Sequence, residues 1–163
     1  MSFPLSDQDV IVTGAGRGLG SSIAAAFAKQ GAKVAINYRN SRDGAESLAA
    51  SLGDNARAFQ ADVREAADVQ RLVAEVTEAF GAPTTLVHNA LADFVFNGDA
   101  RKKLVEMDWE DFDAHAQTGL RGALNLIHAV KPLMAQRNFG RIIHIGTNLF
   151  QNPVVPYHDY TAT

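Results

Sequence analysis

The stretch Thr13-Gly14-Ala15-Gly16-Arg17-Gly18-Leu19-Gly20 decides the fold of this chain. It follows an apolar run, Val10 to Val12, and it precedes an alanine-rich stretch from Ser21 to Gln30. Glycines in such a place allow a tight turn after a strand, close approach of the backbone to a phosphate, and close packing of a helix on a sheet. The helix start also offers backbone N–H groups and a positive dipole end to an anion. The sequence therefore predicts a strand, a phosphate-binding turn and a helix; a glycine-rich turn without a ligand is the alternative.

The composition is that of a soluble globular protein. The 163 residues suit one domain, and 47% of them are hydrophobic and 20% charged. A net charge of −3 without a block of lysine or arginine argues against a nucleic-acid partner. The absence of cysteine excludes disulfides, zinc–thiolate sites and thiol catalysis, and the histidines lack the spacing of a metal site. No apolar stretch is long enough to cross a bilayer, so we expect a cytoplasmic protein without a membrane partner.

Strand-like and helix-like segments alternate along the chain. Short apolar runs, mostly bounded by Gly, Pro, Asp or Asn, predict strands at Val10–Thr13, Lys33–Tyr38, Ala56–Gln60, Thr84–His88 and Arg141–Ile145. Strands that alternate with helices form βαβ units. The sequence therefore predicts an α/β fold with a doubly wound parallel sheet of the Rossmann type.

Two helices show a clear apolar face. From Ala66 to Phe80 that face holds Val69, Leu72, Val73, Val76 and Phe80. From Trp109 to Met134, where Asp108 is the expected N-cap, it holds Phe112, Leu120, Leu124, Ile127 and Val130. The longest irregular stretch, Leu91 to Met107, follows the carboxyl end of a strand, which is where ligands bind in open α/β sheets.

The end of the second predicted strand indicates which nucleotide binds. NAD-binding units carry an acidic residue there, roughly 20 residues beyond the glycines. This chain has none between Ile36 and Asn40, and Arg39 follows the strand directly. A carboxylate would repel a 2′-phosphate, whereas arginine can pair with it, and Arg17 lies on the same side of the unit. We therefore expect NADP(H) rather than NAD(H), unless Arg17 and Arg39 are ordinary solvated arginines.

Further motifs follow in order. They are Asp62-Val63 after the third strand, His88-Asn89-Ala90-Leu91 after the fourth, Gly140 to Thr147 around the fifth, and Tyr160-Thr161-Ala162-Thr163. Together with the glycine turn, they make the chain resemble the short-chain dehydrogenase/reductase family from Val10 to Thr163, most of all the β-ketoacyl carrier-protein reductase type.

The resemblance implies hydride transfer between NADP(H) and a carbonyl or alcohol substrate, such as a β-ketoacyl thioester. Tyr160 is then the acid/base, and Thr147 takes the place of the usual serine. A phenol with a pKa near 10 needs a nearby cation to act at neutral pH. In the family this cation is a lysine four positions after the tyrosine. The implied cofactor contacts are Gly14, Arg17, Gly18, Leu19, Gly20, Arg39, Asp62, Val63, Asn89 and Tyr160. A homodimer or homotetramer is also implied.

The chain departs from the family pattern in three places. Gly119 stands where the family has a helix asparagine that relays protons, although glycine still permits an irregular turn there. Leu91 replaces a glycine. The chain stops at Thr163, where the lysine should come next. Family members run to roughly 250 residues.

We therefore expect one Rossmann-type domain over residues 1–163, without its C-terminal third and ending near the start of the helix that carries Tyr160. By itself this piece should be inactive. The alternatives are a nucleotide-binding pseudoenzyme and a regulatory partner without catalysis.

Overall fold

The computed structural model describes residues 3–94, 101–152 and 157–162. Within them, five parallel strands form one sheet in the order β3-β2-β1-β4-β5. The strands are β1 (Asp9–Val12), β2 (Lys33–Tyr38), β3 (Ala56–Gln60), β4 (Thr85–His88) and β5 (Arg141–His144). Each predicted strand is confirmed to within one residue at either end.

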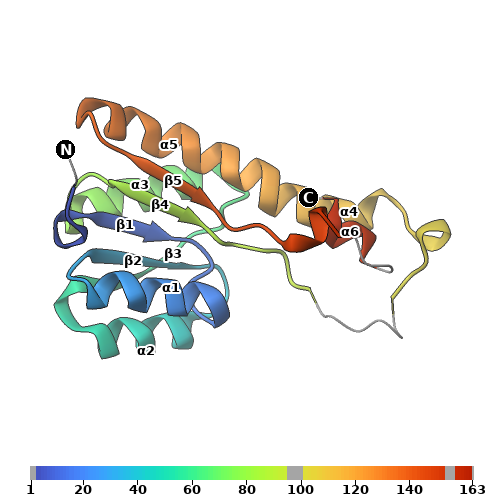
Figure 1. Ribbon diagram of the computed structural model, residues 1–163, viewed down its shortest axis with the longest axis horizontal. Coiled ribbons are helices and arrows are strands. Elements are labelled where there is room, and N and C mark those ends of the chain that lie inside the picture. Colours follow the sequence, from blue (N-terminus) through green and yellow to red (C-terminus); the bar gives the residue numbers. More distant parts are fainter. Residues whose placement is uncertain (1–2, 95–100, 153–156, 163) are drawn as a thin grey trace.

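Helices cover both faces of this sheet (Figure 1). One face carries α1 (Gly18–Lys29) and α2 (Arg42–Leu52), and the other carries α3 (Ala66–Ala79) and α5 (Gly122–Gln136). The predicted doubly wound α/β fold is therefore confirmed. Helix α1 begins earlier than the predicted Ser21, because the last glycines of the turn already form its first turn.

The remaining elements are short. They are η1 (Leu5–Asp7), η2 (Gly53–Asn55), η4 (Leu104–Glu106), α4 (Trp109–Ala116), the π-helix η5 (Gln117–Arg121), η6 (Asn148–Phe150) and α6 (His158–Thr161). Part of the predicted irregular stretch, residues 95–100, lies outside the described residues, as does Thr163. Within the described residues, no helix is long and apolar enough to cross a membrane.

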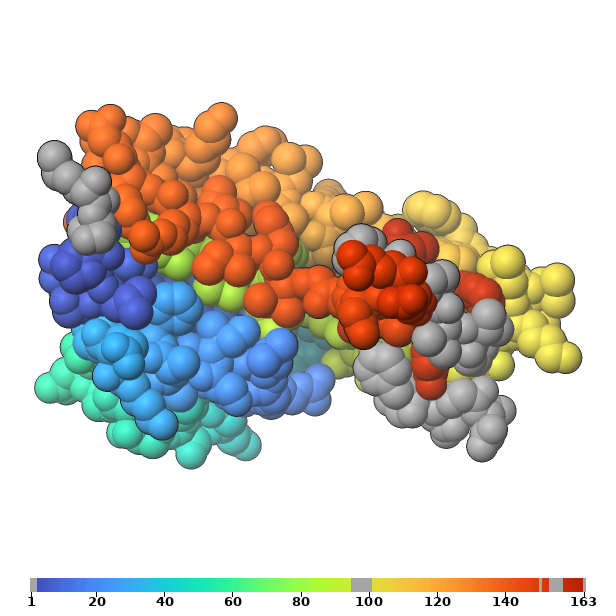
Figure 2. All heavy atoms as spheres, viewed as in Figure 1, coloured from blue at the N-terminus to red at the C-terminus, as the bar shows by residue number. Residues whose placement is uncertain are grey.

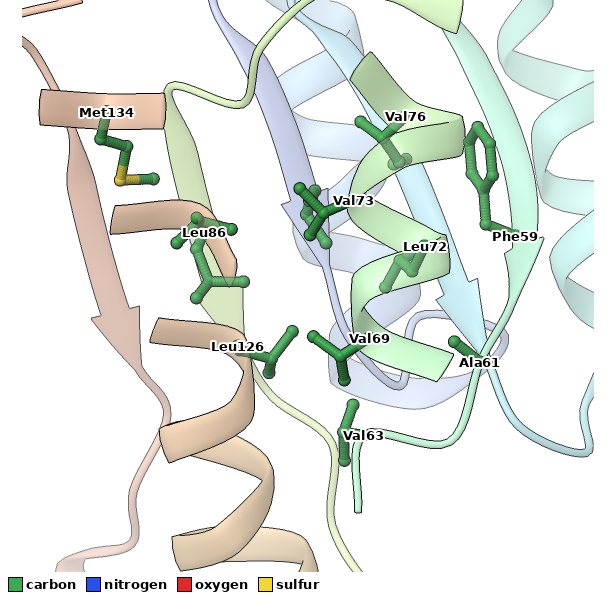
Figure 3. Packing of buried hydrophobic residues seen from close by; sticks show 13 residues of the cluster. Phe59, Ala61, Val63, Val69, Leu72, Val73, Val76, Leu86, Leu126 and Met134 are labelled. Atoms are coloured by element: carbon green, nitrogen blue, oxygen red, sulfur yellow. The ribbon is translucent and has the colours of Figure 1, made fainter. Parts of the chain in front are cut away.

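The larger part of the core lies between the sheet and α3 with α5 (Figure 3). Strand residues Ile11 and Leu86 face Leu126 of α5 and the apolar face of α3 there. The predicted face of α3 is confirmed, since Val69, Leu72, Val73 and Val76 are buried and Phe80 packs against them. The opposite side of the sheet packs on α1 and α2 through small residues such as Ala24 and Ala45.

The predicted long helix from Trp109 is interrupted. Asp108 caps it as expected, because its carboxylate accepts the Asp111 N–H at 3.4 Å and Asp111 accepts the Asp108 N–H at 3.0 Å. The π-helix then separates α4 from α5. Glycine at position 119 does permit an irregular turn.

The predicted apolar face of this helix is wrong at two positions. Leu120 and Leu124 are 61% and 53% exposed. The buried face instead repeats every fourth residue, at Thr118, Gly122, Leu126, Val130 and Met134. A π-turn holds more residues than an α-turn, so it rotates the side chains that follow relative to a regular helix. A regular 3.6-residue period cannot be carried across it.

Candidate active site

The carboxyl ends of β1 and β4 are held together by Thr13. Its hydroxyl oxygen accepts the backbone N–H groups of Asn89 and Ala90, each at 3.0 Å. The side-chain amide of Asn89 donates in return to the carbonyl oxygens of Thr13 and Gly14, at 3.0 and 3.3 Å. Asn89, predicted to touch the cofactor, therefore fixes the glycine turn in place.

Two glycines are required by this arrangement. Gly14 has φ +62°, and a Cβ there would lie 2.9 Å from Ala90 Cα. At Gly20, a Cβ would lie 2.5 Å from the Asn89 amide nitrogen. A side chain at either position would push the turn away from β4.

The helix start next to this turn fits an anion. Gly18, Leu19 and Gly20 are the first residues of α1, and the first N–H groups of a helix have no acceptor inside it. They suit a pyrophosphate, as the sequence predicts. The Leu19 side chain is exposed, so its predicted contact would use the backbone.

Arg17 and Arg39 converge on one carboxylate. Arg17 Nη2 lies 2.9 Å from Asp93 Oδ1, and Arg39 Nη2 lies 3.2 Å from Asp93 Oδ2. The three residues come from the glycine turn, the end of β2 and the segment after β4. The prediction that both arginines lie on one side of the unit is confirmed. Two cations that share one anion here mark a place where a bound phosphate would be stabilised.

Asp62 and Val63 follow β3. The Asp62 carboxylate accepts from the Arg64 backbone N–H at 3.0 Å and from its guanidinium. The Arg64 side chain beside it lowers the pKa of Asp62. The Val63 side chain is buried in the core, and its carbonyl oxygen accepts from Asn125 of α5 at 3.0 Å. The predicted cofactor contacts of Asp62 and Val63 stay predictions.

The predicted acid/base, Tyr160, lies on α6. Its ring centroid is 4.7 Å from that of Phe94 and 6.2 Å from that of His115. Thr147 follows β5, and its hydroxyl oxygen accepts the Leu149 N–H at 3.3 Å. That the two hydroxyl groups meet at a substrate oxygen stays a prediction.

The π-helix is in contact with the end of β4. The Nε2 atom of His88 lies 3.2 Å from the Gly119 carbonyl oxygen, and its Nδ1 atom lies 3.2 Å from the Thr13 hydroxyl. The imidazole is buried, and burial lowers the pKa of His88. His88 therefore links the glycine turn to the helix position where the family asparagine is missing. Its ring also contacts His144 of β5 edge-on, and His144 is exposed.

Comparison with known proteins agrees with this geometry. The family model described as short chain dehydrogenase matches residues 8–163. The chain belongs to the short chain dehydrogenase family. The 3-oxoacyl-acyl-carrier-protein reductase of Staphylococcus epidermidis is 34% identical over 142 residues, which cover 85% of this chain and 56% of the relative. A short-chain type dehydrogenase/reductase of Picea abies is 33% identical over 169 residues, which cover 98% of this chain and 60% of the relative.

Solved structures of the family superpose well on this chain. The closed form of a serine dehydrogenase complexed with NADP+ matches with a TM-score of 0.83 and 31% identity, over 94% of this chain and 59% of that one. Serine dehydrogenase from Escherichia coli matches with a TM-score of 0.82 and 31% sequence identity, over 94% of this chain and 68% of that one. The chain spans about half the length of the curated relatives that it matches.

Several residues of this candidate site were not singled out from the sequence. Thr13 could have been found as the polar residue that ends the first strand. Asp93, Arg101 and Asp159 carry no local signal, because in each Arg–Asp pair that they form the two residues are 54 or more positions apart. Only the folded chain brings such charges together.

Proposed function

We propose that the protein transfers a hydride between NADP(H) and a carbonyl or alcohol substrate. The main support for this proposal is that Arg17 and Arg39 both pair with the Asp93 carboxylate beside the glycine turn. Guanidinium groups that share one carboxylate can share one phosphate, because both anions offer oxygens to the same N–H donors. Strand β2 ends in Asn37 and Tyr38, so no acid at its tip opposes a 2′-phosphate. A structural neighbour complexed with NADP+ supports the same choice.

The residues present fit such a cofactor. The first turn of α1 would hold the pyrophosphate, and Arg17 with Arg39 would hold the 2′-phosphate. When bound, the nicotinamide supplies or accepts the hydride. Tyr160 donates its phenolic proton to the substrate oxygen during reduction and takes it back during oxidation. The Thr147 hydroxyl donates a hydrogen bond to the same oxygen.

For the substrate, we propose a β-ketoacyl thioester first. Curated relatives named 3-oxoacyl-acyl-carrier-protein reductase support this class. We also propose a cytoplasmic homodimer or homotetramer. Exposed apolar side chains along α4, the π-helix and α5 support an interface there, namely Trp109, Leu120 and Leu124.

The test of the cofactor is a charge reversal. In the whole protein, titration should show tighter binding of NADPH than of NADH, and Arg39→Asp should erase or reverse that preference. Lys131→Asp makes the same charge change on the exposed side of α5 and should leave the preference unchanged. Equal binding of both cofactors before mutation would contradict the proposal.

A second candidate function is nucleotide binding without catalysis. It is favoured by Gly119, which has no side chain to relay a proton. Steady-state assays with a β-ketoacyl thioester separate the two functions: the enzyme turns it over, whereas the pseudoenzyme binds NADPH without oxidising it.

A further inference from the structure

A compact group of aromatic and charged side chains surrounds the proposed acid/base. We call it the Asp159 cluster, and its members are Phe94, Arg101, His115, Tyr157, Asp159 and Tyr160. It joins the segment after β4, the segment before α4, α4 itself and α6. From outside, the red atoms of the C-terminal segment lie beside the yellow atoms of the chain that leads into α4 (Figure 2).

The centre of the cluster is an ion pair. Nη2 of Arg101 lies 2.5 Å from Oδ1 and 2.6 Å from Oδ2 of Asp159. The two side chains are only 18% and 9% exposed. Charges so far removed from water are tolerated when they are paired, and leaving either one alone is costly. The pair therefore holds the two segments in one relative position.

Phe94 connects this ion pair to Tyr160. The guanidinium carbon of Arg101 lies 4.4 Å from the centroid of the Phe94 ring, and the Tyr160 ring lies 4.7 Å from it. The Phe94 ring also lies 5.4 Å from that of His115 and 5.7 Å from that of Tyr157. Arg101 and Tyr160 thus pack on the same aromatic side chain.

Helix α6 depends on such contacts for its orientation. It spans four residues, His158–Thr161, and a helix of that length is not stable in water by itself. Asp159 directly precedes Tyr160 in it. Whatever fixes the Asp159 carboxylate therefore restricts how the helix can rotate and where the phenol lies.

We propose that Arg101 and Asp159 are positioning residues for Tyr160. The inference rests on the proposed function, in which Tyr160 is the acid/base. The pair also balances charge beside the Phe94 ring on which Tyr160 packs, because a guanidinium and a carboxylate together add no net charge there. His115 Nε2 lies 3.7 Å from Asp159 Oδ2, and burial lowers the pKa of His115, so its ring adds no charge at neutral pH.

The balance of charge gives the proposal a test that loss of structure alone would not mimic. Arg101→Gln leaves a carboxylate near the phenol and should raise its pKa, whereas Asp159→Asn leaves a cation and should lower it. The pH profile of kcat in the whole protein should therefore shift in opposite directions, each by about half a pH unit or more. The double variant should bring the profile back towards that of the wild type.

We expect each single variant to lower kcat about ten-fold, because a small displacement of a reacting group is costly, and to leave the Kd of NADPH unchanged. Arg101→Lys keeps the charge and loses the planar guanidinium group that lies over the Phe94 ring, so it should lower kcat without moving the profile. If the other variants fail to fold, Arg101→Lys alone tests the positioning role of Arg101. Lys102→Gln is the matched control, since Lys102 is the next residue and pairs with Asp111 at 2.8 Å in a more exposed place.

Shifts in the same direction, or an unchanged kcat in both single variants, would overturn the proposal. The two levels of inference stay separable. If Tyr160→Phe retains turnover, the assignment of the acid/base fails. If Tyr160→Phe loses turnover while Arg101→Gln and Asp159→Asn behave as the wild type, only the positioning role fails.

Discussion

His88 and Gly119 are joined by a hydrogen bond that fixes the tautomer of the imidazole. The Gly119 carbonyl can only accept, so Nε2 of His88 carries the proton and donates it over 3.2 Å. In a neutral ring Nδ1 is then an acceptor, and it receives the Thr13 hydroxyl proton over 3.2 Å. The Thr13 oxygen keeps its lone pairs for the two N–H groups after β4.

This network predicts loss of stability in acid. Burial lowers the pKa of His88 below its ordinary value of 6.5, so the unfolded chain binds a proton that the folded chain resists. The contribution is complete above pH 6.5 and is lost as the pH falls below it, by at most about 1.4 kcal/mol per pH unit for each such histidine. Denaturant unfolding at pH 7.5 and 5.5 measures the effect.

Substitution assigns that effect to His88. The variant His88→Gln should show a weaker pH dependence, with a remainder from His115, whose pKa burial also lowers. His128 is exposed on α5, so His128→Gln should behave as the wild type. An unaltered pH dependence in His88→Gln would contradict the assignment.

Asp93 should compete with the 2′-phosphate. Its carboxylate occupies the guanidinium groups of Arg17 and Arg39, so Asp93→Asn should tighten NADPH binding about two- to five-fold, a small factor because exposed ion pairs are weak. The affinity for NADH should not change, and the gain should shrink at high salt. Fluorescence titration measures both affinities. Glu75→Gln, on the exposed side of α3, is the control variant and should not change the affinity for NADPH. Weaker NADPH binding by Asp93→Asn would contradict the prediction and would mean that the Asp93 carboxylate holds the two arginines in place for the phosphate.

Removal of the phenolic hydroxyl should strongly reduce turnover. Tyr160→Phe is expected to lower kcat by a factor on the order of 10² or more, with the Kd of NADPH nearly unchanged, because it removes the proton donor and keeps the ring. Thr147→Ser keeps a hydroxyl and should be tolerated, whereas Thr147→Val should be harmful. Steady-state kinetics with a β-ketoacyl thioester provide the measurement, and wild-type turnover by the phenylalanine variant would refute the assignment.

The π-turn predicts which leucine of α5 carries stability. Leu126 is fully buried against the sheet, so Leu126→Ala should lower the free energy of unfolding by about 2–5 kcal/mol. Leu124→Ala, two residues earlier and exposed, should change it by less than about 0.5 kcal/mol. Any loss at Leu124 that depends on protein concentration would report a subunit interface rather than the core. If both variants lost the same free energy of unfolding at every protein concentration, the π-turn would not have rotated the buried face of α5 away from Leu124.

The strands were predictable because each is a short apolar run between turn residues, and parallel strands buried on both faces have this composition. The apolar face of α3 was predictable because that helix is regular. Across Gln117–Arg121 the period breaks, and the sequence signals the break only by a glycine. Helix propensity and apolar spacing could not predict by how much the π-helix rotates the side chains that follow it.

The candidate site divides in the same way. The glycine turn and Arg39 belong to the first βαβ unit, so local sequence was enough to predict them. The Asp159 cluster depends on an ion pair between residues 58 positions apart, and no local pattern encodes such a pair. Asp93 lies in a segment without regular structure, where the periodicity of the sequence does not indicate which way a side chain points.

Asp93 and Phe94 are neighbours in the chain, yet Asp93 reaches the arginines of the first βαβ unit and Phe94 contacts Tyr160. The residues proposed to choose the cofactor thus end one position before those proposed to place the phenol. For protein engineering, this makes the two traits exchangeable as blocks. A chimaera joined within β4 would bring its own Asp93 to arginines from another parent and would risk a mismatch. A junction directly after Asp93 would transfer cofactor preference intact and leave the aromatic cluster with its native partners, because sites without shared contacts behave additively.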